Sequence, residues 1–170
     1  MNNNKSIQVK RTIIGVDPGF AILGWGIITG HDINKIDNVE WGAITTKSVD
    51  SIEERLLKIY NELNEIIDYY KPQEISLEKV FFNSNAKTVI SVGQSQGIVL
   101  LIAAQRNISI SQYTPLQVKS ALTGYGKAPK KQIQNMLKLL LHLEDVPRPD
   151  DAADGVALAL CHMQTQMSLS

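Results

Sequence analysis

The chain has 170 residues, of which 44% are hydrophobic and 6% aromatic, and its formal net charge is zero. This profile fits one folded domain, 1–170, with its own core, in which residues 1–10 form a flexible N-terminal extension. No apolar run is long enough to cross a bilayer, and the polar N-terminus is unlike a signal peptide. With Cys161 as the single cysteine, no intrachain disulfide can form; we expect a buried thiol, no membrane association and a cytoplasmic location.

The first half of the chain predicts an antiparallel meander followed by a crossover helix. The predicted strands are 12–16, 21–29 and 39–45. Ser51 and Glu54 have the spacing of a capping box, and apolar residues then recur at helical intervals up to Lys71. The run EISLEKV at 74–80 is predicted to be a strand parallel to an earlier one, because a long helix precedes it.

The second half predicts helices that alternate with one more strand. The predicted helices are 85–106, 114–124, 129–143 and 151–166, and the predicted strand is 108–113. The order of elements is that of a ribonuclease H-like fold, in the α/β class, with a five-stranded mixed sheet flanked by helices.

Four carboxylates are placed to meet in such a fold. If the strands that end near Asp17 and Glu78 are parallel neighbours, both side chains emerge at the same carboxyl edge of the sheet. Asp151 and Asp154, three residues apart, share one face of the last helix. Two like charges about 4 Å apart repel by roughly 4 kcal/mol at an effective dielectric near 20, so the cluster needs a counter-ion. Carboxylate oxygens suit magnesium or manganese, which points to metal-assisted phosphodiester chemistry.

Some of these carboxylates also have a purely structural explanation. Asp17 in GVDPG fits an ordinary turn, and Asp151 fits a helix cap. Both capping and the helix dipole explain Asp154 less well, because apolar residues follow it. Glu78 is costly beside Leu77 in a central strand unless it is paired or bound to a metal.

The basic residues are concentrated in one stretch. Residues 79–143 contain no Asp or Glu, and their eight basic residues are Lys79, Lys87, Arg106, Lys119, Lys127, Lys130, Lys131 and Lys138. A solvated basic face is one explanation, but so long a stretch without an acid favours a surface that faces phosphates.

Four motifs resemble those of the RuvC-type Holliday-junction resolvases, and they cover about residues 12–162: GVDPGFAILGWGII, SLEKVFF, QVKSALTGYGKAPK and PDDAADGVALALCH. The resemblance implies a catalytic tetrad that binds two Mg²⁺ ions per subunit, with Mn²⁺ as a substitute; its members are Asp17, Glu78, Asp151 and Asp154. Two ions about 3.5–4 Å apart would clamp one phosphate, and we expect Asp17 to bridge them.

The resemblance also implies partners and products. It implies a homodimer that nicks two opposed strands of a four-way DNA junction and leaves 5′-phosphate and 3′-hydroxyl ends. A branch-migration motor of the RuvA and RuvB type would work beside it. The helix 85–106 would form the dimer interface, although a buried core helix would have the same apolar pattern.

Three basic residues and one aromatic match DNA-contacting positions of that family. Lys119 and Lys130 match lysines that contact the phosphodiester, and Lys131 replaces Lys130 if the register shifts by one; ordinary solvated helix charge is the alternative. Phe81 matches an aromatic that stacks on bases, which contributes roughly 1–3 kcal/mol per base, and core packing is its alternative.

The chain departs from the family pattern at two positions. Leu23 stands where many relatives carry Thr before the Gly-x-Gly, and this departure leaves the tetrad whole. Asp151 stands where some relatives carry His.

Three functions compete for this sequence. The favoured one is a magnesium-dependent, dimeric junction endonuclease, because the tetrad is intact. In a non-catalytic junction-binding module, the basic residues would still bind DNA, and the acids would serve only in helix caps and turns. A sugar-kinase or actin-like ATPase shares Gly-x-Asp-x-Gly at its first strand, but the chain is too short for the two lobes of such an enzyme.

Overall fold

The computed structural model describes residues 9–79 and 86–167. In chain order its elements are β1 (Arg11–Asp17), β2 (Ile22–Asp32), β3 (Lys35–Thr45), α1 (Ile52–Tyr70), β4 (Glu74–Glu78), α2 (Ala86–Arg106), β5 (Ser109–Tyr113), α3 (Pro115–Thr123), α4 (Lys130–Leu140) and α5 (Asp150–Met167). Phe81 and most of the extension predicted at 1–10 lie outside the described residues.

The strands form one mixed sheet in the order β3-β2-β1-β4-β5. Strands β1, β2 and β3 are the predicted antiparallel meander, and β4 is parallel to both β1 and β5. Val16 of β1 pairs with Leu77 of β4, so the residues that follow them, Asp17 and Glu78, lie at neighbouring strand ends. The prediction that both acids emerge at the same edge of the sheet is therefore confirmed.

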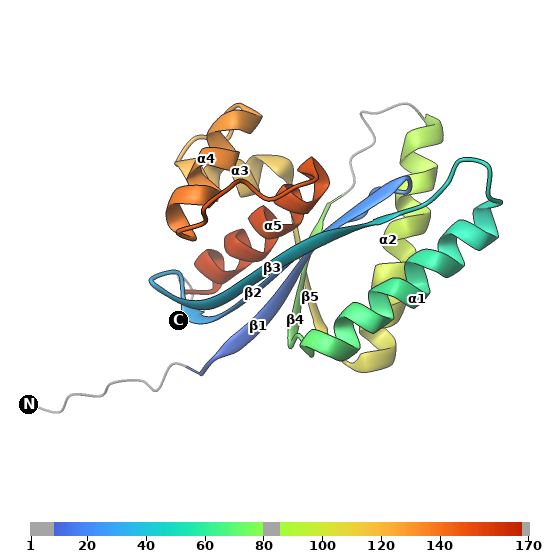
Figure 1. Ribbon diagram of the computed structural model, residues 1–170, viewed down its shortest axis with the longest axis horizontal. Helices are drawn as coiled ribbons and strands as arrows, with labels where there is room; N and C mark the ends of the chain where they lie inside the picture. The colour runs from blue at the N-terminus through green and yellow to red at the C-terminus, as the bar shows by residue number, and fades with distance from the viewer. Residues whose placement is uncertain (1–8, 80–85, 168–170) are drawn as a thin grey trace, which may run out of the picture.

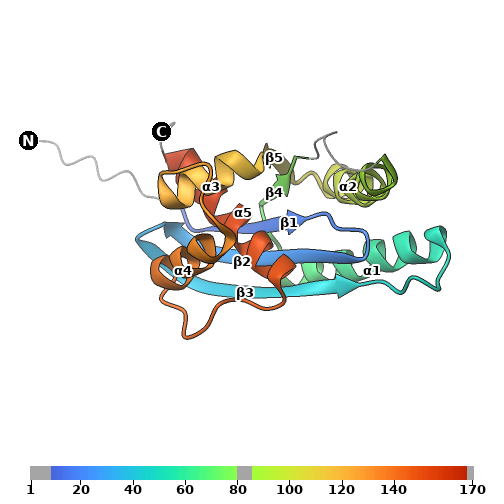
Figure 2. The same cartoon turned by 90° about the horizontal axis from the view of Figure 1, so that it is seen from above.

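Helices cover both faces of this sheet. Helices α1 and α2 lie on one face, and α3, α4 and α5 lie on the other (Figure 1). The same division is visible from above in Figure 2. Successive strand residues point to opposite faces, so Ile13 packs in the core under α3–α5 and Ile14 in the core under α1 and α2. Each face thus has its own apolar core.

Local signals set several element ends. Ser51 and Glu54 form the predicted capping box of α1, and Lys71 ends the helix in the left-handed conformation. Thr114 caps α3 in the same way, with Gln117 as its reciprocal partner. These ends were predictable because each depends on residues only a few positions apart.

Several predicted elements have different bounds in the structure. The helix predicted at 129–143 ends at Leu140, and His142 then adopts a positive φ of 51°. The strand predicted at 39–45 begins four residues earlier, at Lys35, because β2 and β3 continue into a hairpin. In its turn, the backbone N–H of Asn34 donates to Asp32 Oδ1 at 2.7 Å. The exposed polar residues of this hairpin hide its strand pattern in the sequence.

Close backbone contact fixes α5 on the sheet. A Cβ atom on Gly24 of β2 would lie 1.9 Å from the carbonyl oxygen of Asp151, and one on Gly15 would lie 2.0 Å from that of Gly155. Only glycine permits this approach. Cys161 of α5 is buried as predicted, and burial raises the pKa of its thiol to about 11. Of the helices in 9–79 and 86–167, none is long and apolar enough to cross a membrane.

Candidate metal and nucleic-acid site

Helix α5 runs along β4, and every fourth residue of the helix contacts every second residue of the strand. At one end, His162 Nε2 lies 2.7 Å from Glu74 Oε2; one helical turn earlier, the Ser76 hydroxyl donates to the Leu158 carbonyl at 2.7 Å. Strand residues two apart share a face, and so do helix residues four apart. The next pair in this series is Glu78 and Asp154, so the geometry of α5 and β4 directs the two acids toward each other.

Asp17 lies at the centre of the acidic cluster. Burial, together with the neighbouring charges of Glu78, Asp154 and Asp151, raises the pKa of Asp17 to about 8, against an opposing effect of Lys130. All four sequence-predicted acids therefore act on one another electrostatically.

The ionised forms of Glu78 and Asp154 are also disfavoured. Burial raises the pKa of Glu78, and the charge of Asp154 adds to the rise. Burial also raises the pKa of Asp154, although its hydrogen bond from Lys130 opposes the shift. A cation placed among these groups would favour their ionised forms and remove this cost.

The donor set fits a hard divalent ion. Among the residues that the structure describes, no three His, Cys, Asp or Glu side chains are arranged as a ready-made metal site. Oxygen donors from Asp17, Glu78 and Asp154 nevertheless converge from three elements, and such donors suit Mg²⁺ or Mn²⁺.

Lys130 lies against the cluster. Its Nζ is 3.1 Å from Asp154 Oδ2 and 3.5 Å from Asp150 Oδ2. Asp150, the first residue of α5, accepts hydrogen bonds at Oδ1 from Gln134 at 3.2 Å and Arg148 at 3.1 Å. The contacts of Lys130 and Gln134 with Asp150 were not predictable from local pattern, because they depend on how α4 packs beside α5.

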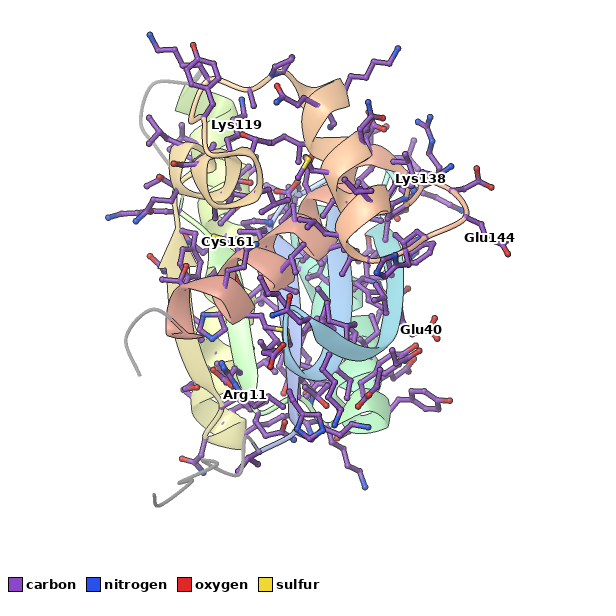
Figure 3. All side chains as sticks on the ribbon, turned by 90° about the vertical axis from the view of Figure 1, so that its left-hand side faces the viewer. Arg11, Glu40, Lys119, Lys138, Glu144 and Cys161 are labelled. Atoms are coloured by element: carbon purple, nitrogen blue, oxygen red, sulfur yellow. The ribbon has the colours of Figure 1, made fainter. Side chains whose placement is uncertain are left out.

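A pocket of about 230 Å³ joins the acids to the predicted phosphate-binding lysines. Its polar walls are Glu78, Asp154, Lys119 and Lys130, and its apolar walls come from α3, α4 and α5. Lys119 projects from α3 at one end of the molecule, opposite Arg11 (Figure 3). Four of the predicted site residues thus line one cavity, although they come from four elements.

Asp151 lines a different pocket, of about 470 Å³, together with residues of the loop after β1 and of α1 and α2. That pocket also holds Arg55, whose guanidinium lies 4.0 Å from the centre of the Phe20 ring and whose Nε donates to Thr46 Oγ1 at 2.8 Å. The side chains of Asp151 and Asp154 thus border separate cavities, although the charges of both raise the pKa of Asp17. Arg55 had no signal in the sequence beyond its place on a polar helix face.

The basic stretch 79–143 is less uniform in space than in sequence. Arg106, at the end of α2, forms an ion pair with Asp68 and a hydrogen bond with Asn64 of α1. Lys138, on α4, lies apart from Lys119 and on the side of Glu144 (Figure 3). Only part of the basic stretch therefore faces the acidic cluster.

Comparisons with known proteins agree with this architecture. The family model described as crossover junction endodeoxyribonuclease RuvC matches residues 13–162. The chain belongs to the RuvC family. A RuvC protein of Pseudothermotoga lettingae is 53% identical over 150 residues, which cover 88% of this chain and 92% of the relative. That of Alkaliphilus oremlandii is 50% identical over 153 residues, or 90% of this chain and 93% of the relative.

Solved structures of RuvC proteins share the fold. Thermus thermophilus RuvC in complex with a Holliday junction substrate superposes with a TM-score of 0.84 and 29% sequence identity, over 93% of this chain and 96% of that one. The yeast mitochondrial Holliday junction resolvase Ydc2 has a TM-score of 0.64 at 15% identity, over 98% of this chain and 85% of that one, which shows a shared fold. The ribonuclease H-like fold predicted from the order of elements is confirmed.

Proposed function

We propose that this chain is a structure-selective endonuclease that resolves four-way DNA junctions in recombination and repair. It makes paired nicks by phosphodiester hydrolysis and leaves 5′-phosphate and 3′-hydroxyl ends. The observation that carries this proposal is the buried acidic cluster, which opens into a pocket shared with two lysines in a chain of the RuvC family.

The acids of the cluster hold divalent cations in this proposal. Asp17, Glu78, Asp151 and Asp154 bind two Mg²⁺ ions per subunit, and Mn²⁺ substitutes. When bound, these ions supply a Lewis acid and an activated water. Asp17 supports their binding in its ionised form, which a metal-free site disfavours because burial and like charges raise its pKa.

Basic and aromatic side chains hold the DNA. Lys119 and Lys130 contact backbone phosphates from two walls of the pocket, with Lys131 next to them on α4. Phe81 stacks on bases near the crossover. The logarithm of the binding constant falls with the logarithm of the salt concentration, with a slope of about 0.9 for each phosphate contact on duplex DNA. Lys119→Gln removes one contact and is expected to reduce this slope by about 0.9.

A homodimer places two such sites on one junction. Along α2 an exposed stripe of apolar and small residues recurs at helical spacing: Ile90, Gly93, Gly97, Leu100, Leu101 and Ala104. Both glycines have open space where a Cβ would be, so another helix can approach closely. This stripe supports the predicted dimer interface. Work beside a RuvA- and RuvB-type motor and a cytoplasmic location accord with the same substrate.

The proposal is tested on a synthetic four-way junction with each strand labelled in turn. In Mg²⁺ the wild-type protein should nick two opposed strands at symmetric positions, and in EDTA it should bind without nicking. Asp17→Asn and Glu78→Gln should lower the rate at least about 10³-fold while junction binding persists. Full cleavage by either variant would refute the site, and binding without any cleavage by wild type would favour a non-catalytic module.

A further inference from the structure

Lys130 bridges an acid of the proposed metal site and an acid outside it. It is the first residue of α4, and its Nζ lies within ion-pair distance of Asp154 and Asp150, one helical turn apart on α5. Asp154 is a proposed metal ligand, whereas Asp150 has no role in the proposed chemistry. An ammonium group and a divalent cation both neutralise a carboxylate, so Lys130 and a metal ion compete for Asp154.

Asp150 is held in place independently of Lys130. Gln134 lies one turn after Lys130 on α4 and donates to Asp150 Oδ1 at 3.2 Å; Arg148 donates to the same oxygen at 3.1 Å. Lys130 approaches the other oxygen, Oδ2. The carboxylate is therefore oriented by two donors and presents its remaining oxygen to the lysine.

We propose that Asp150 is a positioning residue that retains Lys130 at the mouth of the acidic cluster while the lysine exchanges Asp154 for a DNA phosphate. In the metal-free protein, Lys130 is the counter-ion of Asp154. When Asp154 turns to a cation, Asp150 remains as the partner of the ammonium group. This inference deepens the proposed function and rests on it.

The pocket geometry gives the released lysine its next partner. Lys130 and Lys119 border the same cavity as Glu78 and Asp154, so a phosphate brought to the acids also meets both ammonium groups. Lys130 is half exposed, with 50% of its side-chain surface accessible, and therefore has room to turn from Asp154 toward that phosphate. The ion pair with Asp150 keeps the Lys130 ammonium group near the pocket during this movement.

The first test measures Mn²⁺ binding to the protein alone by electron paramagnetic resonance of the free ion, with no DNA present. Lys130→Gln should tighten binding about 3–5-fold because the competing cation is gone, whereas Lys131→Gln, with the same loss of charge, should change it less than about 1.5-fold. Asp150→Asn should weaken binding about 2–3-fold because Lys130 then has Asp154 as its sole carboxylate partner.

The double variant separates positioning from a general charge effect. In a Lys130→Gln background, Asp150→Asn should no longer change Mn²⁺ affinity. An equal effect of Asp150→Asn in both backgrounds would overturn the inference, because simple long-range charge would then explain it. No tightening on Lys130→Gln would overturn it as well.

A second measurement uses cleavage at saturating junction and Mg²⁺. Asp150→Asn should lower kcat about 3–10-fold with an unchanged Kd for the junction, and Asp150→Glu should restore most of the rate. An unchanged kcat in Asp150→Asn would contradict the inference. A wild-type protein that neither binds Mn²⁺ nor cuts junctions would remove the proposed function together with it, whereas failure of the variant tests alone would remove only the role of Asp150.

Discussion

At the scale of single residues, Asp17 shows how the metal-free site opposes folding. Burial and three acidic neighbours raise its pKa to about 8, from 3.8 in the unfolded chain. Between these two pH values the folded protein binds a proton that the unfolded chain has lost. Stability therefore falls as pH rises through this window, by at most about 1.4 kcal/mol per pH unit from this group.

Replacement of Asp17 by Asn should remove this dependence. In EDTA at pH 8 we expect Asp17→Asn to raise the free energy of unfolding by about 1–3 kcal/mol over wild type, with a smaller gain at pH 5. Urea denaturation at the two pH values checks this. The matched control is Asp37→Asn, since a hydrogen bond from Lys10 lowers the pKa of that exposed carboxyl. A gain of the same size in the control, or none in Asp17→Asn, would contradict the account.

At the scale of elements, the position of α5 on the sheet brings the acids together. Gly24→Ala would force a methyl group into the Asp151 carbonyl, and we expect it to cost about 2–3 kcal/mol of stability and to displace the start of α5. Gly126→Ala is the control, because its new methyl group would lie 2.9 Å from Cγ of the exposed Leu116 side chain and no closer than 3.5 Å to the Leu116 carbonyl oxygen, an ordinary contact. The free energy of unfolding measured in urea and the rate of junction cleavage should both fall in Gly24→Ala but not in Gly126→Ala. Equal effects in the two variants would count against this role of Gly24.

The far end of α5 depends on a buried histidine. His162 lies between Glu74 and the Tyr113 hydroxyl, each at 2.7 Å, and burial lowers its pKa although Glu74 opposes the shift. Arg11 already pairs with Glu74 through two hydrogen bonds of 2.6 Å, so that carboxylate is neutralised without a second cation. His162 is therefore neutral in the folded protein near neutral pH.

This histidine should make the fold sensitive to acid. Its pKa is 6.5 in the unfolded chain and lower in the folded one, so its contribution is complete above pH 6.5 and is lost as pH falls below that value. We expect His162→Gln to lose about 1–2 kcal/mol at pH 7.5 and less at pH 5. Thermal unfolding at both pH values measures the difference, and an equal loss at the two values would disprove the titration of His162.

Sequence reasoning reached the parts of the site that follow from local pattern. The strand ends at Asp17 and Glu78 were predictable, because a crossover helix makes the second strand parallel to an earlier one. The i, i+3 spacing of Asp151 and Asp154 was also readable, but their separate pockets were not. The contact of Lys130 with Asp150 depends on how α4 packs against α5, and no local pattern encodes that packing.

At the scale of the whole molecule, the candidate site and the proposed dimer interface lie on opposite faces of the sheet. Helices α3, α4 and α5 border the site, and α1 and α2 cover the opposite face (Figure 1). The exposed stripe of α2 lies on that second face, away from α4. The proposed dimer can therefore form without covering the pocket that holds the lysines. That the chain is a single domain remains a prediction.

The dimer is tested by one charge on α2. Leu101 is 48% exposed, and Leu101→Glu should convert the dimer to monomers in sedimentation velocity because a carboxylate cannot be buried between two copies without a partner. Leu57→Glu is the matched control on α1, where Leu57 is 59% exposed. The monomeric variant should lose paired nicking. A mass that is unchanged in Leu101→Glu would contradict an interface on α2.

The binding of cations by the acidic cluster is tested most directly by anomalous diffraction from crystals of the wild-type protein soaked in Mn²⁺. The account predicts Mn²⁺ peaks bonded to Asp17, Glu78 and the start of α5, with Lys130 turned away from Asp154. Mn²⁺ bound only to exposed acids elsewhere, with Lys130 still paired to Asp154, would contradict it.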